Sequence, residues 1–149
     1  MATLRPLTDA NRAALTALRV APHQQRFVSS VSDSLAEAAE HPAAKPLCFG
    51  VYEADAPVGF VMLADDVDEP DYIPRYLWKL LIDQQHQGRG LGTAALELVV
   101  AFFRSRPGGA VVTTRCHQGE GSPITFYERF GFVRTGDVSD GEVWLQYTL

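Results

Sequence analysis

Gln87-Gly88-Arg89-Gly90-Leu91-Gly92 is a glycine-rich stretch that separates two apolar segments of different periodicity. The residues before it, 76–83, are apolar on both sides, which is typical of a strand buried inside a sheet. After it, apolar side chains such as Leu98 and Phe102 recur at helical spacing until a Pro-Gly-Gly sequence at 107–109 ends the pattern. The sequence therefore predicts a strand, a turn of bare backbone and a helix in direct succession.

A turn in this position has the features of an anion-binding site. The first amides of a helix lack partners within the helix, the helix dipole is positive there, and glycines let a diphosphate approach the main chain. A nucleotide P-loop needs Gly-x-x-x-x-Gly-Lys-Ser/Thr, which the chain does not contain. The dinucleotide fingerprint Gly-x-Gly-x-x-Gly fits poorly, because Gly88, Gly90 and Gly92 alternate with single residues. The remaining interpretations are another diphosphate site or a turn without a ligand.

The rest of the chain alternates between helical and extended patterns. Helices are expected over residues 8–19, 22–41 and 122–130, with Thr8 and Ser122 as N-caps. Further strands are expected over residues 3–6, 47–53, 57–63, 111–116 and 142–149. No repeat or linker divides the chain, so we expect one α/β domain over residues 1–149 with a mixed sheet.

Composition and charge exclude several classes of protein. The chain has 149 residues, of which 46% are hydrophobic and 21% charged, as in ordinary globular proteins. Its apolar runs are shorter than the roughly 18 residues of a membrane helix, and no secretory core follows the N-terminus, so we expect a cytoplasmic protein. The net charge of −5 argues against nucleic acid as a partner. Cys48 and Cys116 belong to no metal-binding pattern and are expected to be small buried hydrophobes.

Two motifs together resemble those of the GNAT superfamily of N-acetyltransferases. Gln87-x-x-Gly90-x-Gly92 matches the family's Gln/Arg-x-x-Gly-x-Gly/Ala signature, and Ile82-Asp83 resembles the pair that ends the family's preceding strand. The sequence Phe-Tyr-Glu-Arg-Phe-Gly-Phe at 126–132 is similar to the family's late aromatic motif. A predicted strand lies between the two motifs, as it does in the family.

This resemblance implies a mixed, mostly antiparallel central sheet that is flanked by helices and splayed between two central strands. It also implies acetyl-CoA as co-substrate, with its pyrophosphate on the amides of the glycine turn and its pantetheine arm on the splayed strand. The peptide groups that splaying leaves unpaired would find partners in that amide-like arm. The matching residues are Leu80, Leu81, Ile82, Gln87, Gly88, Arg89, Gly90, Leu91, Gly92 and Thr93. No metal is implied, and the resemblance allows a homodimer.

The family's catalytic tyrosine matches Tyr127, whose side chain would point toward the sulfur of the co-substrate. A phenol has a pKa of about 10 and a thiol of about 8.5, so complete proton transfer to a thiolate is uphill by roughly 2 kcal/mol. A hydrogen bond to the developing thiolate is therefore the role we expect for Tyr127. The alternative is that Tyr127 only packs in the aromatic core.

A proton acceptor for the amine is harder to identify. Two positions where relatives often carry glutamate read Trp78 and Arg115. The remaining candidates are His117 at the end of its strand, Glu120, and Asp83 or the acidic loop acting through water. For each of them, a solvated surface group is the competing interpretation.

The acidic run at 65–71 precedes the central strand and favours a cationic acceptor. Residues 76–78 and 119–123 resemble those of bacterial diamine and polyamine N-acetyltransferases, so we expect direct acetyl transfer to a small di- or polyamine in a ternary complex. Two alternatives remain open: an acetyl-CoA-binding sensor without turnover, and an N-acetyltransferase that acts on peptides or proteins.

Overall fold

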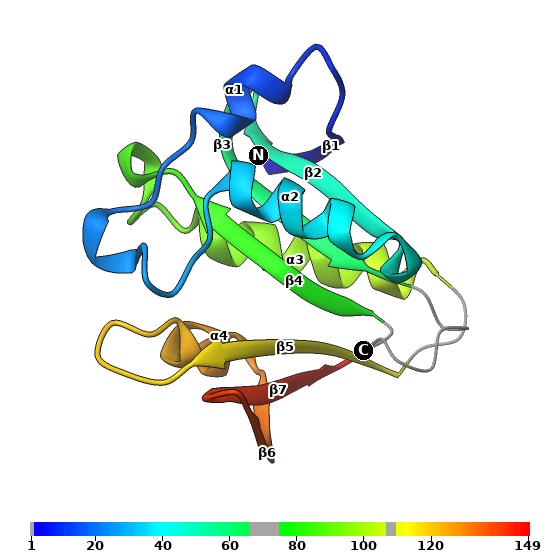
Figure 1. Ribbon diagram of the computed structural model, residues 1–149, viewed down its shortest axis with the longest axis vertical. Coiled ribbons are helices and arrows are strands. Elements are labelled where there is room, and N and C mark those ends of the chain that lie inside the picture. Colours follow the sequence, from blue (N-terminus) through cyan, green and yellow to red (C-terminus); the bar gives the residue numbers. More distant parts are fainter. Residues whose placement is uncertain (1, 66–74, 107–109) are drawn as a thin grey trace.

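A single seven-stranded sheet organises the computed structural model, which describes residues 2–65, 75–106 and 110–149. The strands lie in the order β1-β2-β3-β4-β5-β7-β6 (Figure 1). Their bounds are β1 Ala2–Pro6, β2 Pro46–Glu53, β3 Ala56–Ala64, β4 Tyr76–Ile82, β5 Val111–His117, β6 Val133–Ser139 and β7 Glu142–Thr148. Every neighbouring pair is antiparallel except β4 and β5. The fold is thus the predicted α/β class with a mixed, mostly antiparallel sheet.

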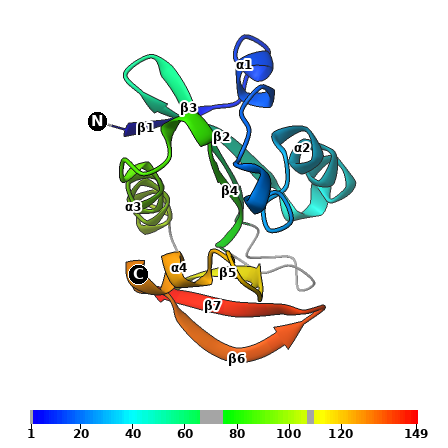
Figure 2. The same cartoon turned by 90° about the vertical axis from the view of Figure 1, so that its left-hand side faces the viewer.

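The sheet opens between β4 and β5. Within the described residues, these parallel strands pair at Tyr76 and Thr113 only, where the Thr113 amide donates to the Arg75 carbonyl at 3.1 Å. One step further, the Thr114 hydroxyl donates to the Leu77 carbonyl at 2.9 Å. Beyond this point the strands diverge, so the ribbon has two wings, β1–β4 and β5–β7 (Figures 1 and 2). The predicted splay between the two central strands is confirmed.

Helices cover both faces of the sheet and create two cores. On one face α3 Leu91–Arg104 and α4 Ile124–Phe130 bury a core that joins the wings, since it contains Leu77 of β4 and Leu145 of β7. On the other face α1 Arg12–Thr16 and α2 Val31–Glu40 pack on Phe60 of β3. Short 3-10 turns complete the chain: η1 Pro22–Gln24, η2 Pro42–Ala44 and η3 Gln84–His86. Among the described residues, no helix has the length and hydropathy that a membrane crossing requires.

The early helical predictions need correction. Residues 22–41 do not form one helix, because the chain leaves the helical conformation after η1 and re-enters it at Val31, with Ser30 as the extended N-cap. The Ser30 hydroxyl accepts a hydrogen bond from the Asp33 amide at 3.1 Å, so Ser30 is the N-cap of α2. A helix that continued through Ser30 would lose this capping hydrogen bond. The N-cap of α1 is Asn11 rather than Thr8, and the Thr8 amide instead donates to the Asn11 side chain at 2.7 Å.

Strand β6 was not predicted from the sequence. Nearly all of its residues are exposed, so it has no alternation of apolar and polar side chains to mark it as a strand. Its pairing with β7 is also irregular, with a register shift between Arg134 and Val138. Edge strands of this kind are held by the hairpin that carries them rather than by burial.

Candidate active site

The glycine turn connects β4 to α3 and presents bare backbone. Gly88 and Gly90 have φ angles of 78° and 76°, a left-handed conformation that glycine adopts without strain. Gly90 is the N-cap of α3, and its carbonyl accepts the first helical hydrogen bond, from Ala94, at 3.0 Å. The amides of Leu91, Gly92 and Thr93 therefore have no partner inside the helix. A Cβ at Gly88 or Gly90 would meet no atom within 4 Å, so a ligand can approach the main chain.

Gln87 fixes this turn to the end of β4. Its side-chain amide donates to the Ile82 carbonyl at 2.9 Å and to the Gln24 side chain at 2.7 Å. Arg89 points elsewhere: its guanidinium forms an ion pair with Glu53 and contacts the His86 ring at 3.1 Å. The turn is thus anchored through side chains while its amides face outward.

The opened edge of β4 carries peptide groups on the side away from β3. The Asp83 amide donates to the Val58 carbonyl of β3 at 2.8 Å, so the peptides of Asp83 and Leu81 face β3. Because successive peptides of a strand alternate in direction, those of Leu80 and Ile82 face β5 instead. The β5 side is where the sheet is splayed, so a ligand could complete the sheet at Leu80.

A cavity of about 460 Å³ lies over the turn and the opened edge. It contains every residue predicted to bind the co-substrate except Arg89, together with the α4 residues Phe126 and Tyr127. From the N-terminal half it receives Val20, Gln24, Phe27 and Val28, and from the loop before α4 it receives Gly121, Ser122 and Pro123. The two wings of the sheet therefore build one cavity between them.

Tyr127 stands at the inner end of this cavity. Its side chain is buried and packs against Phe126 and Phe132, each with a ring-centroid distance of 5.3 Å. Burial raises the pKa of Tyr127 well above its usual range, and a hydrogen bond with the Thr114 side chain opposes this only in part. The phenol therefore keeps its proton at neutral pH and can act as a hydrogen-bond donor.

A second, smaller cavity of about 120 Å³ shares Tyr127 and Leu80 with the first and opens toward the α2 face. Its charged lining consists of Glu37, Lys79, Arg115 and Glu142, and its aromatic lining includes Tyr76 and Trp78. It continues into a wider polar cavity of about 570 Å³ that Lys79 and Glu142 also line. Two cavities thus meet at Tyr127, one over the glycine turn and one lined by Glu37 of α2.

A bulge in β4 explains how Glu37 enters the site. Leu77 pairs with Leu63 and Lys79 pairs with Met62, so Trp78 is an extra residue in the strand. The bulge turns Trp78 and Lys79 to the same face, where the indole donates to Glu37 Oε1 at 3.0 Å and the ammonium lies 3.0 Å from Oε2. Burial alone would raise the pKa of Glu37, but the hydrogen bond and charge of Lys79, with the Trp78 indole, lower it overall.

The predicted proton acceptors lie in different places. His117 is exposed and lines the wide polar cavity, directly across the ladder from Glu142. Glu120 lines a separate surface cavity, and its backbone carbonyl accepts a hydrogen bond from Arg26 at 2.8 Å. The Asp83 carboxylate accepts hydrogen bonds from the Arg19 amide at 2.8 Å and from the Gln85 amide at 3.2 Å. Both oxygens of Asp83 therefore already stabilise the backbone around the end of β4.

The acidic run at 65–71 lies outside the described residues except for Asp65. Asp65 forms an ion pair with Arg106. Sequence reasoning missed Glu37 and Glu142, because one lies on an amphipathic helix and the other begins an ordinary strand. Only the β4 bulge and the pairing of β5 with β7 bring these carboxylates to the cavities.

Comparisons with known proteins agree with this geometry. The model of the acetyltransferase (GNAT) family matches residues 14–132. A spermine/spermidine N(1)-acetyltransferase of Bacillus subtilis is 30% identical over 138 residues, which cover 91% of this chain and 90% of that protein. The chain therefore belongs to the GNAT acetyltransferase family and is an acetyl-CoA-dependent N-acetyltransferase.

Solved structures support the fold. The GNAT domain of S. lividans PAT has a TM-score of 0.76 at 19% identity, over 99% of this chain and 90% of that one. An aminoglycoside acetyltransferase solved with coenzyme A also has a TM-score of 0.76, at 20% identity, over 99% of this chain and 95% of that one. At these identities the likeness concerns the architecture.

Proposed function

We propose that this enzyme acetylates a primary amine of a small di- or polyamine by direct attack on acetyl-CoA in a ternary complex. The observation that carries the proposal is the meeting of two cavities at Tyr127, one over the glycine turn and one on the α2 face. Two reactants, one in each cavity, would meet there without a covalent enzyme intermediate. The B. subtilis relative, named for spermine and spermidine, supports the acceptor class.

The residues over the first cavity fit the pyrophosphate and pantetheine of acetyl-CoA. Backbone amides of Gly88, Arg89, Gly90, Leu91, Gly92 and Thr93 would hold the pyrophosphate, because those of the first helical turn lack partners and the glycines leave open space. The Leu80 peptide would pair with the pantetheine arm, while Leu81 and Ile82 supply apolar contacts. Gln87 would act by fixing the turn rather than by touching the ligand. Acetyl-CoA itself supplies an activated thioester.

Tyr127 would donate a hydrogen bond to the leaving sulfur, since its buried phenol stays protonated. The amine must lose a proton before it attacks, and we assign its acceptance to His117, directly or through water. His117 suits this role because it lines the polar cavity on the acceptor side, and histidine is the side chain that most often serves as a general base. Glu120 would be a weaker candidate, because its side chain lines another cavity.

The test is an acetyl-transfer screen with acetyl-CoA against diamines, polyamines, aminoglycosides, amino acids and short peptides. We expect kcat/KM to be highest for a di- or polyamine. If kcat/KM were highest for basic peptides, the proposed acceptor class would be wrong, but the protein would still be an N-acetyltransferase. Acetyl-CoA binding without transfer to any acceptor would instead favour a sensor.

A further inference from the structure

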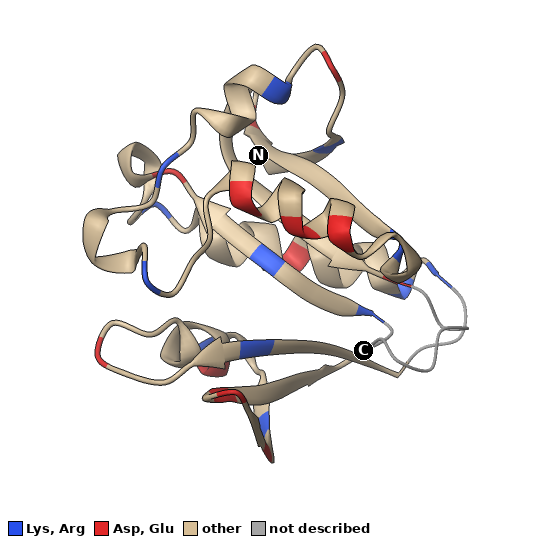
Figure 3. Ribbon diagram, in the orientation of Figure 1, with Lys and Arg blue, Asp and Glu red and all other residues tan. Residues whose placement is uncertain are grey.

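The acceptor-side cavity contains an ion pair whose cation is part of the protein. The Lys79 ammonium lies 3.0 Å from Glu37 Oε2 and donates to the Ser29 hydroxyl at 3.0 Å. The Lys79 side chain is 19% exposed and that of Glu37 is 38% exposed, so the carboxylate is open to the cavity. The α2 helix carries its acidic residues beside β4, the strand of Lys79 (Figure 3).

The position of the Glu37 carboxylate is fixed independently of Lys79. The Trp78 indole donates to its other oxygen at 3.0 Å, and Trp78 is in turn stacked with Tyr76 at a centroid distance of 6.3 Å. His41 also packs against the Trp78 ring, at a centroid distance of 6.0 Å. A carboxylate oriented in this way would keep its place if the lysine left.

The end of a lysine side chain is a primary ammonium on an alkyl chain, which is also the chemistry of either end of a diamine. We propose that Glu37 is the subsite for the distal ammonium of the acceptor, and that Lys79 is an internal competitor that this ammonium displaces. This inference rests on the proposed function, because it assumes an acceptor with a second ammonium. It makes Glu37 and Lys79 determinants of specificity for diamines over monoamines.

Exchange at Glu37 is physically reasonable because the pair is partly exposed. Ion pairs with solvent access contribute little net stability, since water replaces most of the lost attraction. Lys79 keeps the Ser29 hydroxyl as a partner and can extend into the wide polar cavity that it also lines. The arriving ammonium gains a carboxylate whose position the Trp78 indole already fixes.

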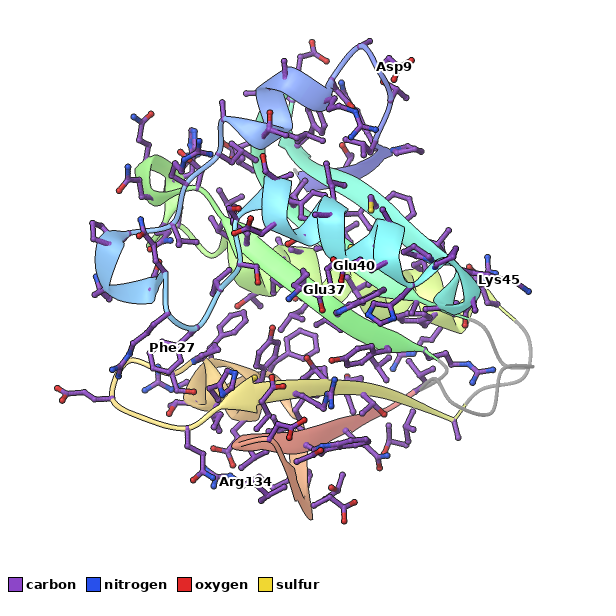
Figure 4. All side chains as sticks on the ribbon, in the orientation of Figure 1. Asp9, Phe27, Glu37, Glu40, Lys45 and Arg134 are labelled. Atoms are coloured by element: carbon purple, nitrogen blue, oxygen red, sulfur yellow. The ribbon has the colours of Figure 1, made fainter. Side chains whose placement is uncertain are left out.

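The experiment compares putrescine with n-butylamine, which share a four-carbon chain and differ by one ammonium. KM for both amines is measured at saturating acetyl-CoA for the wild type, E37Q, K79M and the double variant. E40Q is the matched control, because Glu40 is an exposed carboxylate one turn further along α2 (Figure 4). Thermal melting with and without acetyl-CoA verifies that each variant is folded.

We expect E37Q to raise KM for putrescine about tenfold, the loss of a charged hydrogen bond, with little change for n-butylamine. K79M should have the opposite effect and lower KM for putrescine, and it should have no such effect in the E37Q background. A purely structural ion pair cannot produce this gain, so K79M that leaves KM for putrescine unchanged or raised overturns the inference. Equal shifts for both amines also overturn it. If the wild type acetylates neither amine nor any di- or polyamine of the acceptor screen, the proposed acceptor class itself fails.

Discussion

Tyr127 allows the catalytic and the packing interpretation to be separated by one atom. Tyr127→Phe removes the hydroxyl but keeps the ring contacts with Phe126 and Phe132. The lost donor faces charge that develops only in the transition state, so turnover should fall by roughly 10² to 10⁴-fold while acetyl-CoA affinity stays nearly constant. Single-turnover transfer to the best acceptor, beside a titration of acetyl-CoA, measures both quantities.

Tyr147→Phe is the control for this variant. Tyr147 packs against Phe130 and Phe132 in the same aromatic cluster, at centroid distances of 5.2 and 5.5 Å, but it does not line either cavity that Tyr127 lines. We expect it to transfer acetyl groups at the wild-type rate. If Tyr127→Phe also did so, Tyr127 would be a core residue, and another group would have to stabilise the leaving sulfur.

Glu37 makes stability depend on pH in a predictable direction. Its folded pKa lies below the unfolded value of about 4.3, so the folded state holds fewer protons in that range. The stabilisation is present above the unfolded pKa and is lost as pH falls through the folded pKa. Urea unfolding from pH 7 to pH 3 should therefore show the wild type losing its advantage over E37Q in acid. An advantage that persisted at pH 3 would contradict the assignment.

At the residue scale, the sequence predicted those candidate site residues that belong to short contiguous motifs. Tyr127 and the glycine turn depend on local sequence, and in the structure they line one cavity. Glu37 could not be found in this way, because its function depends on a bulge that adds Trp78 to β4. Register shifts arise from the pairing of two strands, and neither strand alone encodes them.

At the scale of elements, the turn before α3 combines two demands on Gly90. Valine there would have to adopt a left-handed φ and would place a β-branched side chain over the amides. The strain should lower the free energy of unfolding by roughly 1–3 kcal/mol. Acetyl-CoA affinity should fall by more than the smaller fraction of folded protein can explain. Binding to the folded variant, measured by calorimetry below its melting temperature, gives the comparison.

Gly136→Val supplies the matched control for Gly90→Val. Gly136 also has a positive φ, 95°, and a Cβ added to it would meet no atom within 4 Å, but it lies on the exposed strand β6. It should lose comparable stability and keep full affinity for acetyl-CoA. If Gly90→Val bound as well as Gly136→Val, the phosphate site would have to lie elsewhere.

Elements with a buried face could be predicted, and those without one could not. The apolar periodicity of α3 and the two-sided apolar pattern of β4 correspond to the core that each buries. Strand β6 buries almost nothing, so its sequence contains no such signal. The helix expected over 22–41 failed for another reason: the hydroxyl of Ser30 offers a cap that competes with continuation of the helix.

At the scale of the whole molecule, two wings depend on one core. Beyond the single pair between Tyr76 and Thr113, the ladder contributes nothing between β4 and β5 in the described part of the chain. The core under α3 and α4 nevertheless includes buried side chains from both wings, among them Val51, Leu77 and Leu145. We propose on this basis that residues 1–149 form one cooperative domain.

Acetyl-CoA should test that proposal together with the site. Its cavity is lined from both wings, by Leu80 and Gly90 on one and Tyr127 on the other, so binding stabilises their native arrangement as a unit. A ligand that binds only the native state adds about 2.7 kcal/mol at a hundredfold excess over Kd. For a domain of about 150 residues this corresponds to a rise in Tm of roughly 5–10 °C. We expect one calorimetric transition, and we expect its Tm to rise when acetyl-CoA is added. Two transitions would show that the two wings unfold independently. An unchanged Tm at millimolar acetyl-CoA would show that the protein does not bind acetyl-CoA at the proposed site.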